Sequence, residues 1–155
     1  MKRIIVTVAI LLVFSFQGFT QDYGTAIGVR GTYVSGLTIK HFFDETKAGE
    51  GILAFGRWGF NVTGLYEFHA PAFDAERLKW YYGGGAHLGQ WNDDYPSLVN
   101  EGANFVMGID GILGLEYKIK EIPITLSADW KPTFNLTGYP GFWGYGGALS
   151  IRFTL

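Results

Sequence analysis

Apolar and polar residues alternate with a period of two along most of the chain after residue 21. The clearest segment is 124–134, where Leu126 and Trp130 share one face and Asp129 and Lys131 share the other. A period of two places successive side chains on opposite sides of an extended strand, whereas an amphipathic helix repeats every 3.6 residues. The pattern therefore predicts an all-β protein.

Eight such segments predict eight strands. Their approximate bounds are 25–34, 36–43, 50–57, 60–69, 79–88, 105–117, 124–134 and 148–155, the third being the least clear in phase. In an up-and-down meander, the long links 91–103 and 136–144 lie at one end, and the links 44–49, 70–77 and 118–122 lie at the other with both termini. An even strand number with the longest links at one end favours an eight-stranded antiparallel up-and-down transmembrane β-barrel.

The two faces of these strands differ in composition. One face carries large apolar side chains with hardly a charge, and nine of them are expected to face lipid: Phe105, Ile109, Leu113, Leu115, Leu126, Trp130, Leu149, Ile151 and Phe153. The other face combines small residues with eight charged ones, which are expected to form a network inside the barrel: Arg30, Lys40, Glu67, Asp110, Glu116, Asp129, Lys131 and Arg152. A membrane barrel has this arrangement because hydrocarbon surrounds it, whereas a soluble barrel turns its apolar face inward.

The charges on the small-residue face are balanced, four basic against four acidic. Isolated charges in a narrow lumen are costly unless they are paired. The lumen of an eight-stranded barrel is just filled by side chains. We therefore expect an interior closed by ion pairs and hydrogen bonds rather than an open pore.

Residues 1–20 have a different pattern. Lys2 and Arg3 precede an apolar run over 4–16, and the small residues Gly18 and Thr20 come before Gln21. This pattern predicts a secretory signal peptide at 1–20 and a barrel domain at 21–155. The apolar run, about 13 residues, is shorter than the roughly 20 that a spanning helix needs.

Composition narrows the function classes. The chain has 155 residues, no Cys and a formal net charge of −2, without a cluster of Lys or Arg. The absence of Cys excludes disulfides and attachment of a lipid to a cysteine. The absence of a basic patch argues against nucleic-acid binding.

Catalytic motifs are sparse. The chain has no G-x-S-x-G, H-E-x-x-H or P-loop motif, so we expect no enzyme activity, no cofactor and no metal site. One alternative remains open, because Glu67, His69 and His87 all fall on interior faces of strands. A carboxylate and imidazoles that meet there are what a lipid-A-modifying barrel enzyme needs, although a serine nucleophile with the right facing is missing.

The signal peptide, the alternating Gly-rich strands and the apolar series of the last segment, 148–155, together resemble the small outer-membrane β-barrel proteins of Gram-negative bacteria, with barrels like those of OmpA and OmpX. The resemblance implies export through the Sec pathway, contact with outer-membrane lipid, a monomer, and recognition of the last strand by the barrel-assembly machinery. That strand typically ends in Phe in the family, whereas this chain ends in Leu155 with Phe153 two residues before it. The implied role is structural or in surface interactions, and the alternative is a soluble periplasmic barrel that binds a small apolar ligand.

Overall fold

The computed structural model describes residues 23–31, 35–56, 59–91, 105–138 and 140–155. The signal peptide expected at 1–20 and nearly all of the link expected at 91–103 lie outside these ranges. The described elements are β1 (Thr25–Gly31), β2 (Ser35–Phe42), β3 (Lys47–Gly56), β4 (Gly59–Pro71), β5 (Leu78–Trp91), β6 (Phe105–Lys118), β7 (Ile124–Trp130), β8 (Thr133–Asn135), β9 (Gly141–Trp143) and β10 (Gly147–Thr154). None of the described residues forms a helix that is long and apolar enough to cross a membrane.

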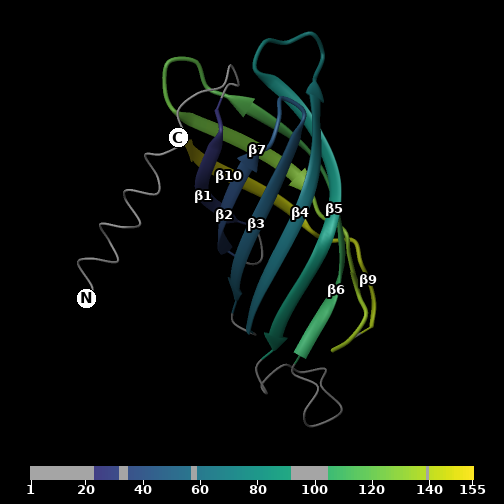
Figure 1. The fold of residues 1–155 in the computed structure, drawn as a ribbon. Helices are drawn as coiled ribbons and strands as arrows, with labels where there is room; N and C mark the ends of the chain where they lie inside the picture. The colour runs from purple at the N-terminus through teal and green to yellow at the C-terminus, as the bar shows by residue number, and fades with distance from the viewer. Residues whose placement is uncertain (1–22, 32–34, 57–58, 92–104, 139) are drawn as a thin grey trace, which may run out of the picture.

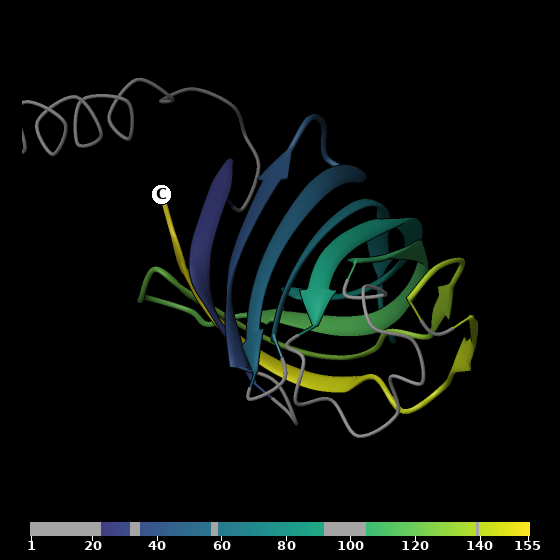
Figure 2. The ribbon, with the colours of Figure 1, turned by 90° about the horizontal axis from the view of Figure 1, so that it is seen from below.

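Eight of these strands form a closed antiparallel barrel. Each strand from β1 to β6 pairs with the strand that follows it in the chain, so the series runs from β1 to β7. β7 then pairs with β10, and β10 pairs with β1 (Figure 1). The ring is closed by six residue pairs between β1 and β10, from Ala26↔Thr154 to Gly31↔Leu149. Figure 2 shows the strands surrounding a common interior, with the β8–β9 hairpin to one side of it. The all-β class and the eight antiparallel barrel strands are therefore confirmed.

The predicted strand at 124–134 is interrupted. β7 ends at Trp130 and β8 begins at Thr133, because Pro132 has no N–H to donate to a neighbouring strand. Its carbonyl oxygen still accepts a hydrogen bond from Gly111 N at 2.9 Å, so the two pieces stay aligned along β6. The link predicted at 136–144 is also not all loop, since it contains β9, which pairs with β8.

The third strand runs over 47–56 rather than the predicted 50–57. Its phase was unclear because both of its faces carry apolar residues. Ile52 is 4% exposed and points into the barrel, whereas the neighbouring Leu53 lies opposite Leu37 and Val62 on the outer face.

Glycines allow close approach between strands along β5. A Cβ placed on Gly85 would lie 1.8 Å from the carbonyl oxygen of Gly64 on β4, so no side chain fits there. A Cβ on Gly64 itself would meet nothing within 4 Å. The glycine-rich stretch of β5 is therefore a site of tight strand packing.

The turns at one end of the barrel are tightly hydrogen-bonded. After β2, Thr46 donates to Asp44 Oδ1 from its backbone N–H and from its hydroxyl, each at 2.8 Å. These two donors, together with Lys47, lower the pKa of Asp44. After β4, the turn is closed by bonds such as Ala72 N to Leu78 O, and Phe73 in it has a φ of +53°. We call this the turn end, and β10 also finishes there (Figure 1).

Two small apolar clusters pack inside the barrel. One, near the turn end, contains Tyr23, Ala26, Phe42 and Ala48. The other, farther along the strands, contains Ile52, Leu65, Tyr81 and Ile112. The interior is therefore not purely polar: apolar packing occupies the space between groups of charged side chains.

Candidate functional site

The structure places the eight charged residues of the predicted interior network on the inward face. Seven of them are buried, and Lys40, Glu67 and Arg152 have no exposed surface at all. Lys131, in the interruption between β7 and β8, is only half-buried, with 19% of its side chain exposed. The side chains come from every barrel strand except β3 and β5, and each ion pair among those that lie on strands joins two different strands.

A central cluster joins two cations to three carboxylates. Lys40 Nζ lies 2.8 Å from Glu67 Oε2, 3.4 Å from Glu116 Oε2 and 3.5 Å from Glu50 Oε2. Arg152 Nη1 lies 3.4 Å from Glu116 Oε2, and its Nη2 pairs with Glu50 Oε1. Glu116 and Glu50 each contact both cations, so the five side chains form one connected unit rather than separate pairs.

Neutral hydroxyl groups complete the coordination of this cluster. Arg152 Nη1 donates to Ser127 Oγ at 2.7 Å, and its Nε donates to Thr38 Oγ1 at 3.3 Å. Thr38 in turn donates to Glu50, and the Tyr23 hydroxyl donates to Glu116. All three guanidinium nitrogens of Arg152 thus donate to oxygens, as a buried cation requires.

The cluster carries one more carboxylate than cations. His69 lies beside this cluster, with its Nε2 3.0 Å from Glu67 Oε2 and its ring stacked on the Tyr81 ring. Glu67 Oε1 and His69 Nδ1 are buried and have no hydrogen-bond partner among the described residues. The Lys40 ammonium also lies 4.0 Å from the centre of the Tyr81 ring, a cation–π contact that adds to its carboxylate contacts.

A second charged group lies farther from the turn end. Both guanidinium nitrogens of Arg30 bond to the two carboxylate oxygens of Asp129, and the Tyr81 hydroxyl donates to Asp129 Oδ2 at 2.8 Å. This forked geometry is the strongest form of an arginine–carboxylate pair. Tyr81 connects the two groups, since its ring contacts Lys40 and its hydroxyl contacts Asp129.

A third group surrounds Asp110 near the opposite end. Lys131 Nζ donates to Asp110 Oδ1 at 2.7 Å, and Thr133 Oγ1 donates to the same oxygen at 2.6 Å. His87 Nδ1 lies 2.8 Å from Asp110 Oδ2. Every carboxylate of the predicted network therefore has a cationic or imidazole partner.

The structure separates the residues considered for an enzyme. Glu67 and His69 meet, whereas His87 contacts Asp110 in a different group. The two buried interior serines near the centre do not complete a catalytic set, because Ser127 binds Arg152 and Ser150 Oγ has no hydrogen-bond partner in the described part of the chain. The described residues also contain no group of three or more His, Asp or Glu side chains arranged to hold a metal ion.

Glu50 was missed by sequence reasoning, although it contacts both central cations. The predicted strand began at this residue, and its inward direction follows only once Ala48 and Ile52 are known to face the interior. No sequence signal pointed to Glu50, because the eight charges expected in the interior were already balanced, four basic against four acidic.

The outer face carries the nine apolar residues expected to face lipid. All nine are exposed, from Leu115 and Leu126 at 40% to Leu149 at 69%. Aliphatic side chains also follow one another across six strands in an oblique row of cross-strand neighbours: Val29, Leu37, Leu53, Val62, Leu88 and Met107.

Aromatic side chains border this aliphatic region at both ends. Toward the turn end, successive ring contacts on the outer surface join Phe43, Tyr66, Phe68, Tyr82 and Trp80. Toward the opposite end, cross-strand pairs join Phe55 to Phe60 and Phe134 to Phe142. The outer surface is therefore mostly apolar, with aromatic rings at two levels.

Comparison of the chain with protein families, with curated proteins and with solved structures found no match.

Proposed function

We propose that the protein is an integral β-barrel of a bacterial outer membrane, with a structural or surface-interaction role and a lumen closed by its charged network. The observation that carries this proposal is the contrast between the two faces. Large apolar side chains such as Ile151 are about half exposed outside, while Arg152, its neighbour in the chain, has no exposed surface. Such a barrel is stable where hydrocarbon surrounds it and is an aggregation hazard in water.

The two levels of aromatic rings support the same proposal. On β5, Tyr82 marks the aromatic level at the turn end, and Gln90, the cross-strand neighbour of Phe60, marks the other level. The strand between these two residues covers about 27 Å at roughly 3.4 Å per residue. A strand tilt of about 40° reduces this to about 21 Å along the barrel axis. Membrane barrels carry an apolar band about 25 Å tall between two aromatic girdles, so the spacing suits a bilayer.

The filled interior supports a closed lumen. The three charged groups and the two apolar clusters occupy successive levels. In the central group, Lys40 of β2 contacts Glu116 of β6, which lies on the opposite side of the ring of strands. The alternative, a soluble barrel with an apolar ligand inside, needs an apolar inner face, which these charges do not provide. Catalysis has no support beyond the Glu67–His69 contact, so we assign no enzyme activity.

Gel migration of the outer-membrane fraction tests the proposal. The chain is expressed in a Gram-negative host, and the fraction is run in SDS with and without boiling. We expect recovery in the outer membrane and a band that shifts on heating, because a closed membrane barrel resists SDS until it is heated. Recovery in the soluble periplasm without a shift would instead favour the soluble barrel.

A leakage assay tests the closed lumen separately. Purified protein is inserted into vesicles that contain a small anionic dye, and release is followed by fluorescence. We expect no release above that of empty vesicles. Steady release from vesicles with correctly inserted protein would show an open path, and the lumen assignment would fail while the membrane assignment stood.

A further inference from the structure

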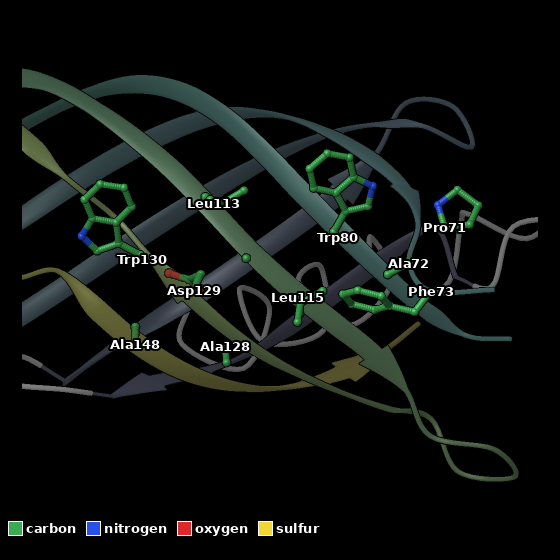
Figure 3. A pocket seen from close by; sticks show the side chains of 11 residues that line it. Pro71, Ala72, Phe73, Trp80, Leu113, Leu115, Ala128, Asp129, Trp130 and Ala148 are labelled. Carbon is green, nitrogen blue, oxygen red and sulfur yellow. The ribbon is translucent and has the colours of Figure 1, made fainter. Parts of the chain in front are cut away.

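A cleft of about 760 Å³ lies on the outer surface near the turn end, across β5, β6 and β7. Its main lining residues are Phe73, Trp80, Leu113, Leu115, Ala128 and Trp130. Figure 3 shows the indole rings of Trp80 and Trp130 on either side of Leu113, with the Phe73 ring beside Leu115. The cleft is thus bounded by aromatic rings and lined by aliphatic side chains.

The strand register explains why the surface is hollow here. Trp80, Leu115, Ala128 and Leu149 are successive cross-strand neighbours on the outer face. Ala128 is the small member of this row, and Gly114 lies beside it in the cleft lining. A small side chain between larger ones leaves a depression that the neighbouring rings deepen.

The Trp130 indole and the Asp129 carboxylate at the cleft already have hydrogen-bond partners. Trp130 Nε1 donates to Gly144 O at 2.7 Å. Asp129 also lines the cleft. Its side chain has no exposed surface, because the carboxylate faces the interior and binds Arg30 and Tyr81. An occupant therefore meets a lining that is mostly apolar.

The position of the cleft selects the kind of occupant. It begins beside the turn after β4, where Phe73 is 84% exposed and held at a φ of +53°, and it extends along the strands to Trp130. On the proposed function, this course runs from the aromatic level at the turn end into the apolar band. A depression there is in contact with one leaflet, and water cannot fill it favourably.

We propose that this cleft binds one acyl chain of a phospholipid from the leaflet at the turn end. The inference rests on the proposed function, since only a membrane-embedded barrel meets acyl chains on this face. The Trp80 and Trp130 rings hold the acyl chain from both sides. The small side chain of Ala128 leaves the space that the acyl chain occupies. The volume lies within the range of roughly 300–1,000 Å³ found for small-molecule sites.

Counting retained phospholipids tests the proposal. Wild-type protein, Ala128→Phe and Ala86→Phe are inserted into vesicles of phosphatidylethanolamine and phosphatidylglycerol, released with a mild detergent and examined by native mass spectrometry. Ala86 is the matched control, because it is also an exposed outward alanine but does not line the cleft. We expect a one-phospholipid species for the wild type and for Ala86→Phe, and at least a tenfold smaller fraction of it for Ala128→Phe.

Insertion is checked for each protein by the heat-dependent gel shift, and Ala128→Leu serves as a smaller change if Ala128→Phe does not insert. Equal retention by inserted wild-type and cleft variants, or no retention by any of them, would overturn the acyl-chain site and leave the membrane barrel intact. Failure of the wild type itself to insert into the vesicles would overturn the proposed function, and this inference with it.

Discussion

Replacing Ile109 by arginine tests which solvent the outer face meets. Ile109 is 55% exposed and is the cross-strand neighbour of Ala86, which lies midway along β5 between Tyr82 and Gln90. Each of those two residues is four positions from Ala86, about 14 Å along the strand at roughly 3.4 Å per residue. A tilt of about 40° makes this about 10 Å along the axis, so Ile109 lies close to the middle of the apolar band between the two aromatic levels.

The expected magnitude depends strongly on the surroundings. An arginine at the lipid-facing midplane of a membrane barrel costs about 2–4 kcal/mol. The same substitution at an exposed position in water costs within about 0.5 kcal/mol, since the charge stays hydrated. For a barrel in a bilayer, the folding equilibrium constant should therefore fall by a factor of roughly 30 to 1,000.

The assay is a guanidinium titration of folding into phosphatidylcholine vesicles, followed by the gel shift. Tyr145→Arg is the control, because this 88% exposed residue lies just before β10, near the second aromatic level, where such a charge costs about 0–1 kcal/mol. We expect a large loss for Ile109→Arg and a small one for Tyr145→Arg. Equal and small losses would refute the assignment of the outer face to hydrocarbon.

Two further pairs of variants and one single variant address the barrel itself. Gly85→Ala should destabilise the barrel by at least about 1–3 kcal/mol, because the added Cβ would overlap a backbone oxygen. Gly64→Ala should change the stability by no more than about 0.5 kcal/mol, because its Cβ would meet no neighbouring atom. The temperature at which each variant loses the gel shift compares their stabilities. Ser127→Ala should cost about 1.5–3 kcal/mol in the same guanidinium titration, because a guanidinium N–H of Arg152 loses its acceptor. Ser150→Ala should cost almost nothing, because the hydroxyl that it removes has no hydrogen-bond partner among the described residues. Arg152→Met should cost about 3–5 kcal/mol, since it leaves buried carboxylates undercompensated, and an unchanged titration midpoint would contradict the role of the network.

The alternation of residues was sufficient to predict the barrel strands, because the period of two holds wherever one face is uniformly apolar. β6 is one clear case, with exposed Ile109 and buried Asp110 as adjacent residues. The same rule failed at β3, where Ile52 faces inward. A small apolar cluster inside the barrel removes the contrast on which the rule depends.

The inward facing of the charged residues could be predicted, but not their pairing. Partners such as Arg30 and Asp129 are 99 residues apart in sequence, and only the closed ring brings their strands together. The contributions of Tyr23, Thr38 and Tyr81 were also out of reach, since nothing in a strand pattern distinguishes a hydroxyl that binds a carboxylate from one that does not. The interruption at Pro132, by contrast, follows from local chemistry and was available from the sequence.

The charged network has a second physical role, in fixing the register of the strands. Buried ion pairs often contribute little more to stability than apolar residues of the same volume. A slip of one residue, however, would turn every inward side chain of a strand outward, because side chains alternate with a period of two. In a bilayer this would place Lys40 or Arg152 in hydrocarbon, at a cost of about 2–4 kcal/mol each near the midplane.

This argument applies most strongly to β3. Its apolar residues face both ways, so hydrophobic contrast alone does not define its register. Glu50 is the residue of β3 that contacts both Lys40 and Arg152, and a one-residue slip would break both contacts and expose the carboxylate on the outer face. The strand whose apolar pattern is weakest is therefore held by a carboxylate that bonds to the two central cations.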